Sequence, residues 1–340
     1  MSEPPPRPML TFVPSPDRFV VEELAAYEPA GAGEHTFLWI EKRGLTTMDA
    51  ARRLARLLGV EARDVGYAGL KDRNAVTRQW VSVPRVDPER ARLISEPDLA
   101  VLKAARHGNK LRTGHLRGNR FELVVTLAAG EEAALRARLE ALAAGGVPNR
   151  FGEQRFGAAG DNAAAGLAIL RGERRERDHR LRRLLLSAAQ SAVFNRALEL
   201  RAAQPAGLRT VRAGDVLQKV ASGGLFITED VAVDQARVDA GELAVTGPLP
   251  GGREKEPPPG TAARALEDEA LAGVGATRED FARAGRDLPG ARRPFLVPLT
   301  LGEPAVQPDP APVGPGEVAL RLRFSLPAGS YATVVVAALG

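Results

Sequence analysis

The sequence contains no cysteine and only four histidines in 340 residues. Without cysteine there can be no disulfide, no thiolate zinc site and no cysteine nucleophile. The histidines, at positions 35, 107, 115 and 179, show no i,i+4 spacing, so we expect no histidine-based metal site. These absences exclude thiol chemistry and argue against a protein-bound metal.

Long apolar runs are also missing. The longest, residues 331–339, is far shorter than the ~20 residues that a membrane helix needs. The proline-rich residues 1–16 contain no apolar segment of the kind that a signal peptide has. We therefore expect a cytoplasmic protein with no membrane partner.

Negative charge is absent from residues 103–120, although the net charge of the whole chain is only +5. This stretch contains six cations: Lys103, Arg106, Lys110, Arg112, Arg117 and Arg120. One-sided charge of this kind indicates a polyanionic partner, with a solvated basic face as the alternative. A second arginine-rich stretch, 171–183, is interrupted by Glu173, Glu176 and Asp178, which favours a salt-bridged or solvated segment.

Residues 67–79 carry the most informative local chemistry. A turn containing Gly69 sets Asp72 between Lys71 and Arg73, and a strand-like run follows at 77–83. Opposite charge within a few Å favours the ionised carboxylate, which suits a nucleophile or a base. Taken alone, such a triplet is more often a solvated turn, because most charge clusters lie on the surface.

Periodicity predicts a mixture of strands and helices. The Thr46-x-x-Asp49 sequence resembles a capping box and predicts a helix that ends at Gly59. Proline-rich segments at 248–260 and 302–316 have the composition of loops or linkers. By themselves these patterns suggest two sequential domains. The predicted strands are 19–24, 36–40, 77–83, 121–127 and 318–324, and the predicted helices are 47–58, 131–144, 184–200, 262–271 and 277–285.

Five blocks in a fixed order point to a known family. In the first, the matching residues are Gly69, Lys71, Asp72, Arg73, Ala75, Val76, Thr77 and Gln79. The others are 106–121, 148–157, the helix residues Ser187, Ala188, Ser191, Phe194 and Asn195, and 326–333. Together they resemble the TruD family of tRNA pseudouridine synthases. One block would be a weak signal, but five ordered blocks are specific.

The resemblance implies an α/β (α+β) fold. A pseudouridine synthase catalytic domain with a central mixed or antiparallel sheet would comprise residues 1–160 and 306–340. A second α/β domain, 161–305, would be inserted into it, with an RNA-binding cleft between the two. The implied function is isomerisation of uridine to pseudouridine in tRNA, at position 13 of the D arm, without a cofactor or metal.

The resemblance also implies roles for particular side chains. Asp72 is the catalytic carboxylate, and attack on C1′, attack on C6 and deprotonation of the sugar all stay open. Lys71 and Arg73 hold Asp72 ionised or bind a flanking phosphate. Phe151 stacks on the flipped uracil, unless it is a core residue. Asn149 has an amide that can read a uracil edge or position Asp72.

Two further residues have alternative roles. Arg155 pairs with Asp72 or with a phosphate, unless it forms a structural ion pair, and Tyr331 closes the pocket or packs. The expected RNA-binding cations are Arg106, Lys110, Arg112 and Arg117.

One departure from the family pattern concerns the last block. Ala337 and Ala338 stand where an Arg-Glu pair is common in the family. The competing function is a non-catalytic RNA-binding or RNA-chaperone protein on the same fold. A metal-dependent phosphotransferase or nuclease is disfavoured, because no carboxylates cluster around Asp72.

Overall fold

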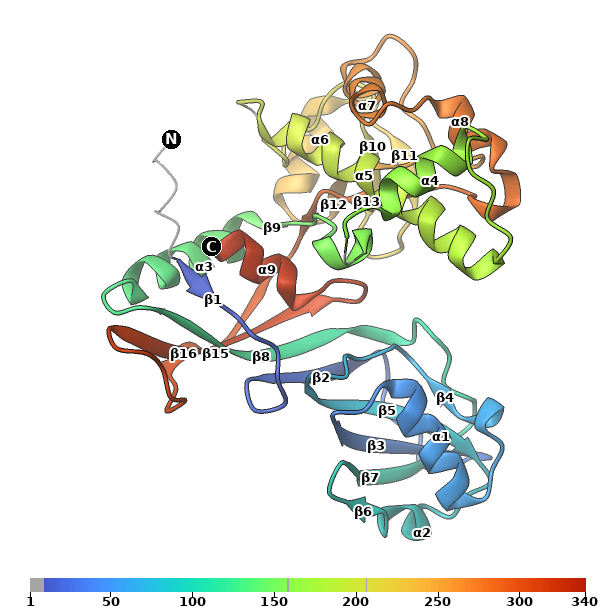
Figure 1. Ribbon diagram of the computed structural model, residues 1–340, viewed down its shortest axis with the longest axis vertical. Helices are drawn as coiled ribbons and strands as arrows, with labels where there is room; N and C mark the ends of the chain where they lie inside the picture. The colour runs from blue at the N-terminus through green and yellow to red at the C-terminus, as the bar shows by residue number, and fades with distance from the viewer. Residues whose placement is uncertain (1–8, 158, 206) are drawn as a thin grey trace. The chain divides into compact units, whose positions relative to one another are not determined.

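The computed structural model describes residues 9–157, 159–205 and 207–340. The chain divides into two compact units (Figure 1). Unit 1 comprises Met1–Gly146 and Pro298–Gly340, and unit 2 comprises Val147–Val297, so the second unit is inserted into the first. The sequence had placed residues 147–160 in the catalytic domain and 298–305 in the inserted domain. In the structure residues 147–160 belong to unit 2 and 298–305 to unit 1.

The boundaries have a simple physical basis. Strand β9 (Val147–Pro148) pairs with β14 (Leu296–Val297), which joins the two ends of unit 2. Strand β15 (Thr300–Pro308) pairs with β16 (Glu317–Pro327) in the sheet of unit 1. Proline-rich composition had suggested a linker at 302–316, and this is wrong for residues up to Pro308. Proline is tolerated there because β15 lies at the edge of the sheet, where a missing N–H costs no ladder hydrogen bond.

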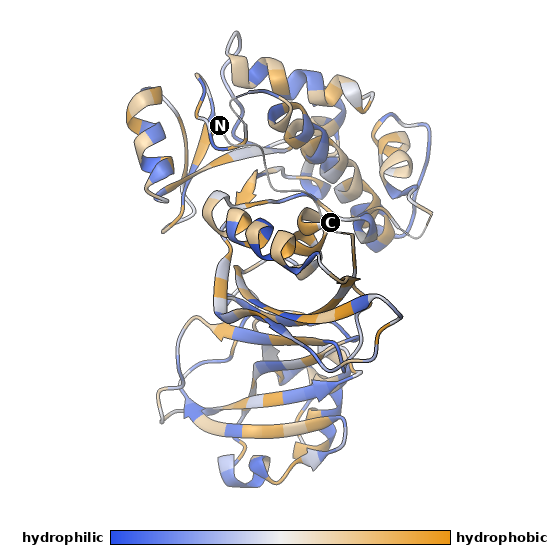
Figure 2. Cartoon of the chain, turned by 90° about the vertical axis from the view of Figure 1, so that its left-hand side faces the viewer, coloured by the Kyte–Doolittle hydropathy of each residue, from blue (hydrophilic) through white to orange (hydrophobic). Residues whose placement is uncertain are grey.

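Unit 1 is built on one mixed sheet, with the order β15-β16-β8-β2-β5-β3-β7-β6. Strand β1 pairs with β8, and β4 pairs with β5. The β2–β5 pair is parallel and the other pairs are antiparallel. Figure 2 shows apolar and polar residues alternating along these strands, as a pleated sheet requires. The remaining strands are β1 (Leu10–Thr11), β2 (Phe19–Ala25), β3 (His35–Arg43), β4 (Gly66–Tyr67), β5 (Val76–Pro84), β6 (Ser95–Glu96), β7 (Leu99–His107) and β8 (Leu116–Ala128).

Helices cover this sheet. Helix α1 (Thr47–Leu58) is capped by the Thr46 side chain and ends at Gly59, whose φ of 72° is a left-handed value that glycine adopts without strain. The helix buries Leu54 against residues of β3, β5 and β7. Helices α3 (Glu132–Gly145) and α9 (Ala332–Leu339) contact each other, and α3 also contacts β15. The short elements of unit 1 are η1 (Ala62–Asp64) and α2 (Pro88–Arg92).

Unit 2 is built around a four-stranded antiparallel sheet with the strand order β11-β10-β12-β13. Its longest helix, α5 (His179–Ala202), begins five residues before the predicted start because Asp178 caps it by accepting two backbone N–H groups. Phe194, Phe281 and Phe295 are central to the core. The other elements are η2 (Glu153–Phe156), α4 (Asn162–Leu170), β10 (Val216–Lys219), β11 (Leu225–Ile227), α6 (Val231–Asp239), β12 (Leu243–Leu249), α7 (Ala262–Gly273), α8 (Arg278–Arg283), η3 (Gly285–Asp287) and β13 (Ala291–Pro294).

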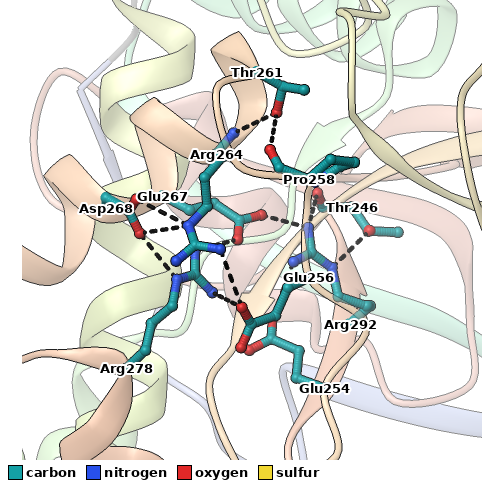
Figure 3. A network of polar contacts seen from close by, with 10 residues as sticks. All are labelled: Thr246, Glu254, Glu256, Pro258, Thr261, Arg264, Glu267, Asp268, Arg278 and Arg292. Carbon is teal, nitrogen blue, oxygen red and sulfur yellow. Dashed lines mark hydrogen bonds and ion pairs between the residues drawn. The ribbon is translucent and has the colours of Figure 1, made fainter.

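A network of buried charged side chains links β12, β13 and α7 of unit 2 (Figure 3). The Arg292 guanidinium on β13 donates to Glu254 at 2.9 Å and to Glu267 of α7 at 2.6 Å. It also donates twice to Thr246 of β12. Arg278 bonds Glu267 from the other side at 3.1 Å. The mixed α/β fold with a large mixed sheet is as predicted.

Candidate active site

Asp72 is exposed on the loop between β4 and β5. Buried hydrogen bonds brace this loop from behind. Gln79 on β5 donates to the Gly69 carbonyl at 3.1 Å, and the Thr47 hydroxyl donates to Gln79 at 2.8 Å. The Lys71 backbone N–H donates to that same hydroxyl at 2.8 Å. The motif therefore presents one carboxylate to solvent from a fixed backbone.

The two cations beside Asp72 diverge. The side chain of Lys71 is buried, with its amine 3.1 Å from Glu23 and 2.5 Å from Asn119 Oδ1. Burial raises the pKa of Glu23 and lowers the pKa of Lys71, while their mutual attraction opposes both shifts. Arg73 is exposed and donates to the Gly44 carbonyl at 3.1 Å. In the described ranges neither cation makes an ion pair with Asp72.

Phe151, in unit 2, is half-buried and rigidly held. Asn195 of α5 accepts from its backbone N–H and donates to its carbonyl, each at 2.9 Å. The Arg293 guanidinium lies 4.3 Å from the ring centroid, and Phe194 meets the ring edge-to-face at 5.5 Å. Arg155 lies 5.5 Å from the same centroid and donates to the Ser191 hydroxyl at 3.1 Å. The ring packs against the hydrophobic core of unit 2 and carries a guanidinium over it, so its contacts are those of a partly buried core residue.

Asn149 is buried and its side chain is engaged inside unit 2. Its amide donates to the Pro294 carbonyl at 2.9 Å, and its side-chain oxygen accepts from Arg293. Its backbone N–H donates to the Phe295 carbonyl at 2.8 Å. One amide hydrogen and one lone pair stay available for another partner.

The basic stretch lies on β7, β8 and the loop between them. Arg120 pairs with Glu22 at 2.9 Å. Lys110 and Arg117 donate to the backbone carbonyls of Arg63 and Ala25, which leaves their charges uncompensated. Three cations, namely Lys103, Arg106 and Arg112, make no side-chain hydrogen bond or ion pair with the described part of the chain.

The predicted site residues are divided between the two units. Unit 1 contains Asp72, Lys71, Arg73, Tyr331 and the basic stretch, and unit 2 contains Asn149, Phe151 and Arg155. Tyr331 precedes α9 and is 60% exposed, so it is not a packing residue of unit 1. In residues 9–157, 159–205 and 207–340 no group of three or more acidic or histidine side chains is arranged to hold a metal ion. None of the helices described there combines the length and apolar character that crossing a bilayer requires.

Sequence reasoning assigned no role to several residues that the structure places around these motifs. Glu23 and Asn119 compensate Lys71, and Arg293 contacts both Asn149 and Phe151. Lys42 on β3 donates to the Asp72 carbonyl at 3.0 Å. A lysine or an arginine in a strand has no local signal of such a contact, because the partner is brought by the sheet from a distant part of the chain.

Comparisons with known proteins agree with this arrangement. The chain matches the sequence profile of the family described as tRNA pseudouridine synthase D (TruD) over residues 11–177 and 174–339. A tRNA pseudouridine synthase D of Anaeromyxobacter sp. (strain Fw109-5) is 47% identical over 330 residues, which cover 95% of this chain and 90% of that protein. The tRNA pseudouridine synthase D of Geobacter metallireducens is 39% identical over 394 residues, which cover 96% of this chain and 93% of that protein.

The fold has a solved counterpart as well. A crystal structure from Methanosarcina mazei, assigned to tRNA pseudouridine synthase D, superposes with a TM-score of 0.76 at 24% identity, covering 94% of this chain and 91% of that one. The profile spans nearly all the described residues, and the identity to relatives is high over almost their full length. The chain therefore belongs to the tRNA pseudouridine synthase D (TruD) family.

Proposed function

We propose that this chain isomerises uridine to pseudouridine in tRNA, with Asp72 as the catalytic carboxylate and position 13 of the D arm as the target. The observation that supports the proposal is the Asp72 loop. It presents one exposed carboxylate, braced from behind by Gln79, Thr47 and Lys71, inside a block that matches the family. The relatives' names supply the substrate class, tRNA.

The reaction needs few groups from the protein. The bond from uracil N1 to ribose C1′ breaks, the base turns while it is held, and C5 forms the new bond to C1′. The C5 proton leaves and N1 gains a proton, so nothing is oxidised and no group is transferred away. An ionised carboxylate can attack the sugar or the base, or accept a proton from the sugar. The fixed loop and the exposed side chain of Asp72 support this role.

Phe151 would hold the base. The target uridine leaves its stack at a cost of a few kcal/mol, and stacking on an aromatic face returns about 1–3 kcal/mol. Asn195 and Arg293 fix the position of this ring. The uncompensated cations of the basic stretch would contact phosphates, which position RNA without reading its sequence.

The decisive experiment replaces Asp72 by Asn. The amide keeps the shape of the side chain but cannot attack or accept a proton, so the single-turnover rate should fall by roughly 10⁴-fold or more. Affinity for tRNA should stay within about twofold, because phosphate contacts dominate it. Pseudouridine would be mapped at nucleotide resolution, with Asp64→Asn, a nearby carboxylate with no side-chain hydrogen bond or ion pair within the described ranges, as the control.

Three outcomes are informative. An Asp72→Asn variant that turns over tRNA near the wild-type rate would overturn the role of Asp72. A wild-type protein that binds tRNA and forms no pseudouridine would support the non-catalytic RNA-binding alternative. Pseudouridine formed only outside position 13 would keep the activity and reject the target.

Phe151 has a separate test. Phe151→Ala should lower the single-turnover rate by about 10- to 100-fold, equivalent to the loss of one base stack, while Phe151→Tyr keeps the ring face and most of the rate. An Ala variant as active as wild type would show that Phe151 is not the platform. A loss of rate matched by a loss of thermal stability would instead favour a core role.

A further inference from the structure

Lys42 occupies an unusual position behind Asp72. It lies on β3 and is fully buried, with 0% of its surface exposed. Its amine donates to the Leu45 carbonyl at 2.6 Å and to the Asp72 carbonyl at 3.0 Å. No carboxylate lies within ion-pair distance of this amine in the described part of the chain.

The other cations near Asp72 are already committed. Lys71 is compensated by Glu23, and Arg73 extends to the surface at the Gly44 carbonyl. The charged groups that act on Lys42 are Asp72, Lys71 and Asp49. Asp49 is exposed and engaged with Thr46 and Arg52 at the start of α1. Lys42 is therefore the buried positive charge nearest to Asp72 that has no acid of its own.

A buried ammonium group without a carboxylate partner destabilises the folded state. Burial removes water from an ammonium group and lowers the pKa of Lys42 to about 8, with the Asp72 carboxylate opposing part of that shift. An apolar side chain would fill the same volume without this cost. Strongly perturbed lysines beside a motif of this kind are typical of functional sites.

We propose that Lys42 is a positioning residue for the reaction: its amine holds the backbone carbonyls of Asp72 and Leu45 and so keeps the Asp72 side chain correctly placed. This inference rests on the proposed role of Asp72. It goes further because it assigns the supporting cation to a residue on a neighbouring strand, not to the two cations that flank Asp72 in the sequence.

The proposal requires a particular pH dependence. As the pH rises through about 8, Lys42 loses its proton. The neutral amine still donates to these carbonyls, but its hydrogen bonds lose their charge assistance and hold the Asp72 loop less firmly. The single-turnover rate of the wild-type enzyme should therefore fall on the alkaline side and level off near the rate of Lys42→Gln, which keeps a donor without the charge.

The test measures single-turnover isomerisation of tRNA from pH 6 to pH 9 in the wild type and in variants of β3. Lys42→Met removes the charge and the donor, and Lys42→Gln removes the charge but keeps a donor. Both should be slower than wild type at pH 7, by about 10²-fold for Met, since misplacing a reacting group by about 1 Å costs this much. Both should lose the alkaline decline, and both should keep tRNA affinity within about twofold.

Ile40→Val serves as the matched control. It alters the same strand at a core position that is 1% exposed, and it should keep both the rate and the alkaline decline. If Lys42→Met does not fold, Lys42→Gln and the wild-type profile carry the test. Wild-type rates for folded Lys42 variants, an alkaline decline that persists in them, or a flat wild-type profile would each overturn the proposal. An active Asp72→Asn variant would overturn the proposed function itself, which separates the two failures.

Discussion

The two units bury charge in different ways. In unit 2 the Arg292 guanidinium is 1% exposed, and each of its three nitrogens donates to Glu254, Glu267 or Thr246 (Figure 3). In unit 1 the buried cations are the lysines Lys42 and Lys71, and only Lys71 has a carboxylate partner within the described ranges. The buried arginine of unit 2 is thus paired with two carboxylates, whereas Lys42 in unit 1 has no carboxylate partner among the described residues.

The choice of cation fits this difference. Arginine stays charged at all relevant pH values and binds carboxylates through a planar fork, which suits a permanent link between strands and helices. Lysine loses its proton readily when it is buried. A buried lysine can therefore change its own charge within the working pH range, which a buried arginine cannot. Buried ionic contacts can thus support the fold in one unit and the reaction in the other.

The largest effect should come from Arg292. Arg292→Met leaves two buried carboxylates, Glu254 and Glu267, without their main cation, and should lower the free energy of unfolding by about 3–5 kcal/mol. Urea denaturation would measure this, with Arg253→Met as control. Arg253 is exposed and neighbours Glu254, and its loss should cost less than about 0.5 kcal/mol. A stable Arg292→Met variant that has lost isomerisation would break the comparison, since charge in unit 2 would then serve the reaction.

Replacement of Glu23 should lower the free energy of unfolding slightly less than replacement of Arg292. Glu23→Leu leaves Lys71 buried without its carboxylate and should cost about 3 kcal/mol, the lower end of the range for a broken buried pair, because Asn119 still accepts from the amine. The double variant Glu23→Leu/Lys71→Met removes both charges and should regain part of that stability. Its single-turnover rate should not recover, because the Asp72 loop has lost its support. Additive losses of stability in the double variant would show that the pair is not coupled.

Measurement of the free energy of unfolding against pH should reveal the raised pKa of Glu254. Burial raises the pKa of Glu254 from 4.5 to about 7, even though Arg292 opposes the shift. Between these values the folded state keeps a proton that the unfolded state has released, so the contribution is complete below pH 4.5 and is lost as the pH approaches 7. Relative to Glu254→Gln, which resembles the protonated form, wild type should lose about 3 kcal/mol over this interval. A constant difference between the two proteins would contradict the shift.

Exposed charges should have the smallest effect on stability and a visible effect on binding. Lys103→Glu with Arg112→Glu, both at exposed positions, should change the free energy of unfolding by less than about 0.5 kcal/mol. The slope of log K for tRNA against log salt should fall by about 0.7 to 0.9 for each phosphate that the variant no longer neutralises. The matched variant in unit 2 is Arg175→Glu with Arg177→Glu, in the stretch that mixes both signs of charge. Equal slopes for the two double variants would show that the basic stretch of unit 1 has no special part in binding.

Local patterns determined much of this protein. The helix at 47–58 could be placed from Thr46 and Gly59, because a cap and a left-handed glycine act within a few residues. The strand at 121–127 followed from alternation, and the Asp72 block was evident from the order of its residues. The absence of cysteine settled the question of thiol chemistry outright.

Tertiary structure decided what local patterns could not. A proline-rich segment became the edge strand β15, because only the sheet determines which strand lacks an outer partner. Lys71 looked like a cation for Asp72 or for RNA, but pairing between β2 and β8 and the course of the loop bring it to Glu23 and Asn119. Lys42 reaches Asp72 across 30 positions of sequence. Sequence therefore specified the reactive carboxylate and its family, while the groups that support it depend on contacts between strands distant in the chain, which no local pattern encodes.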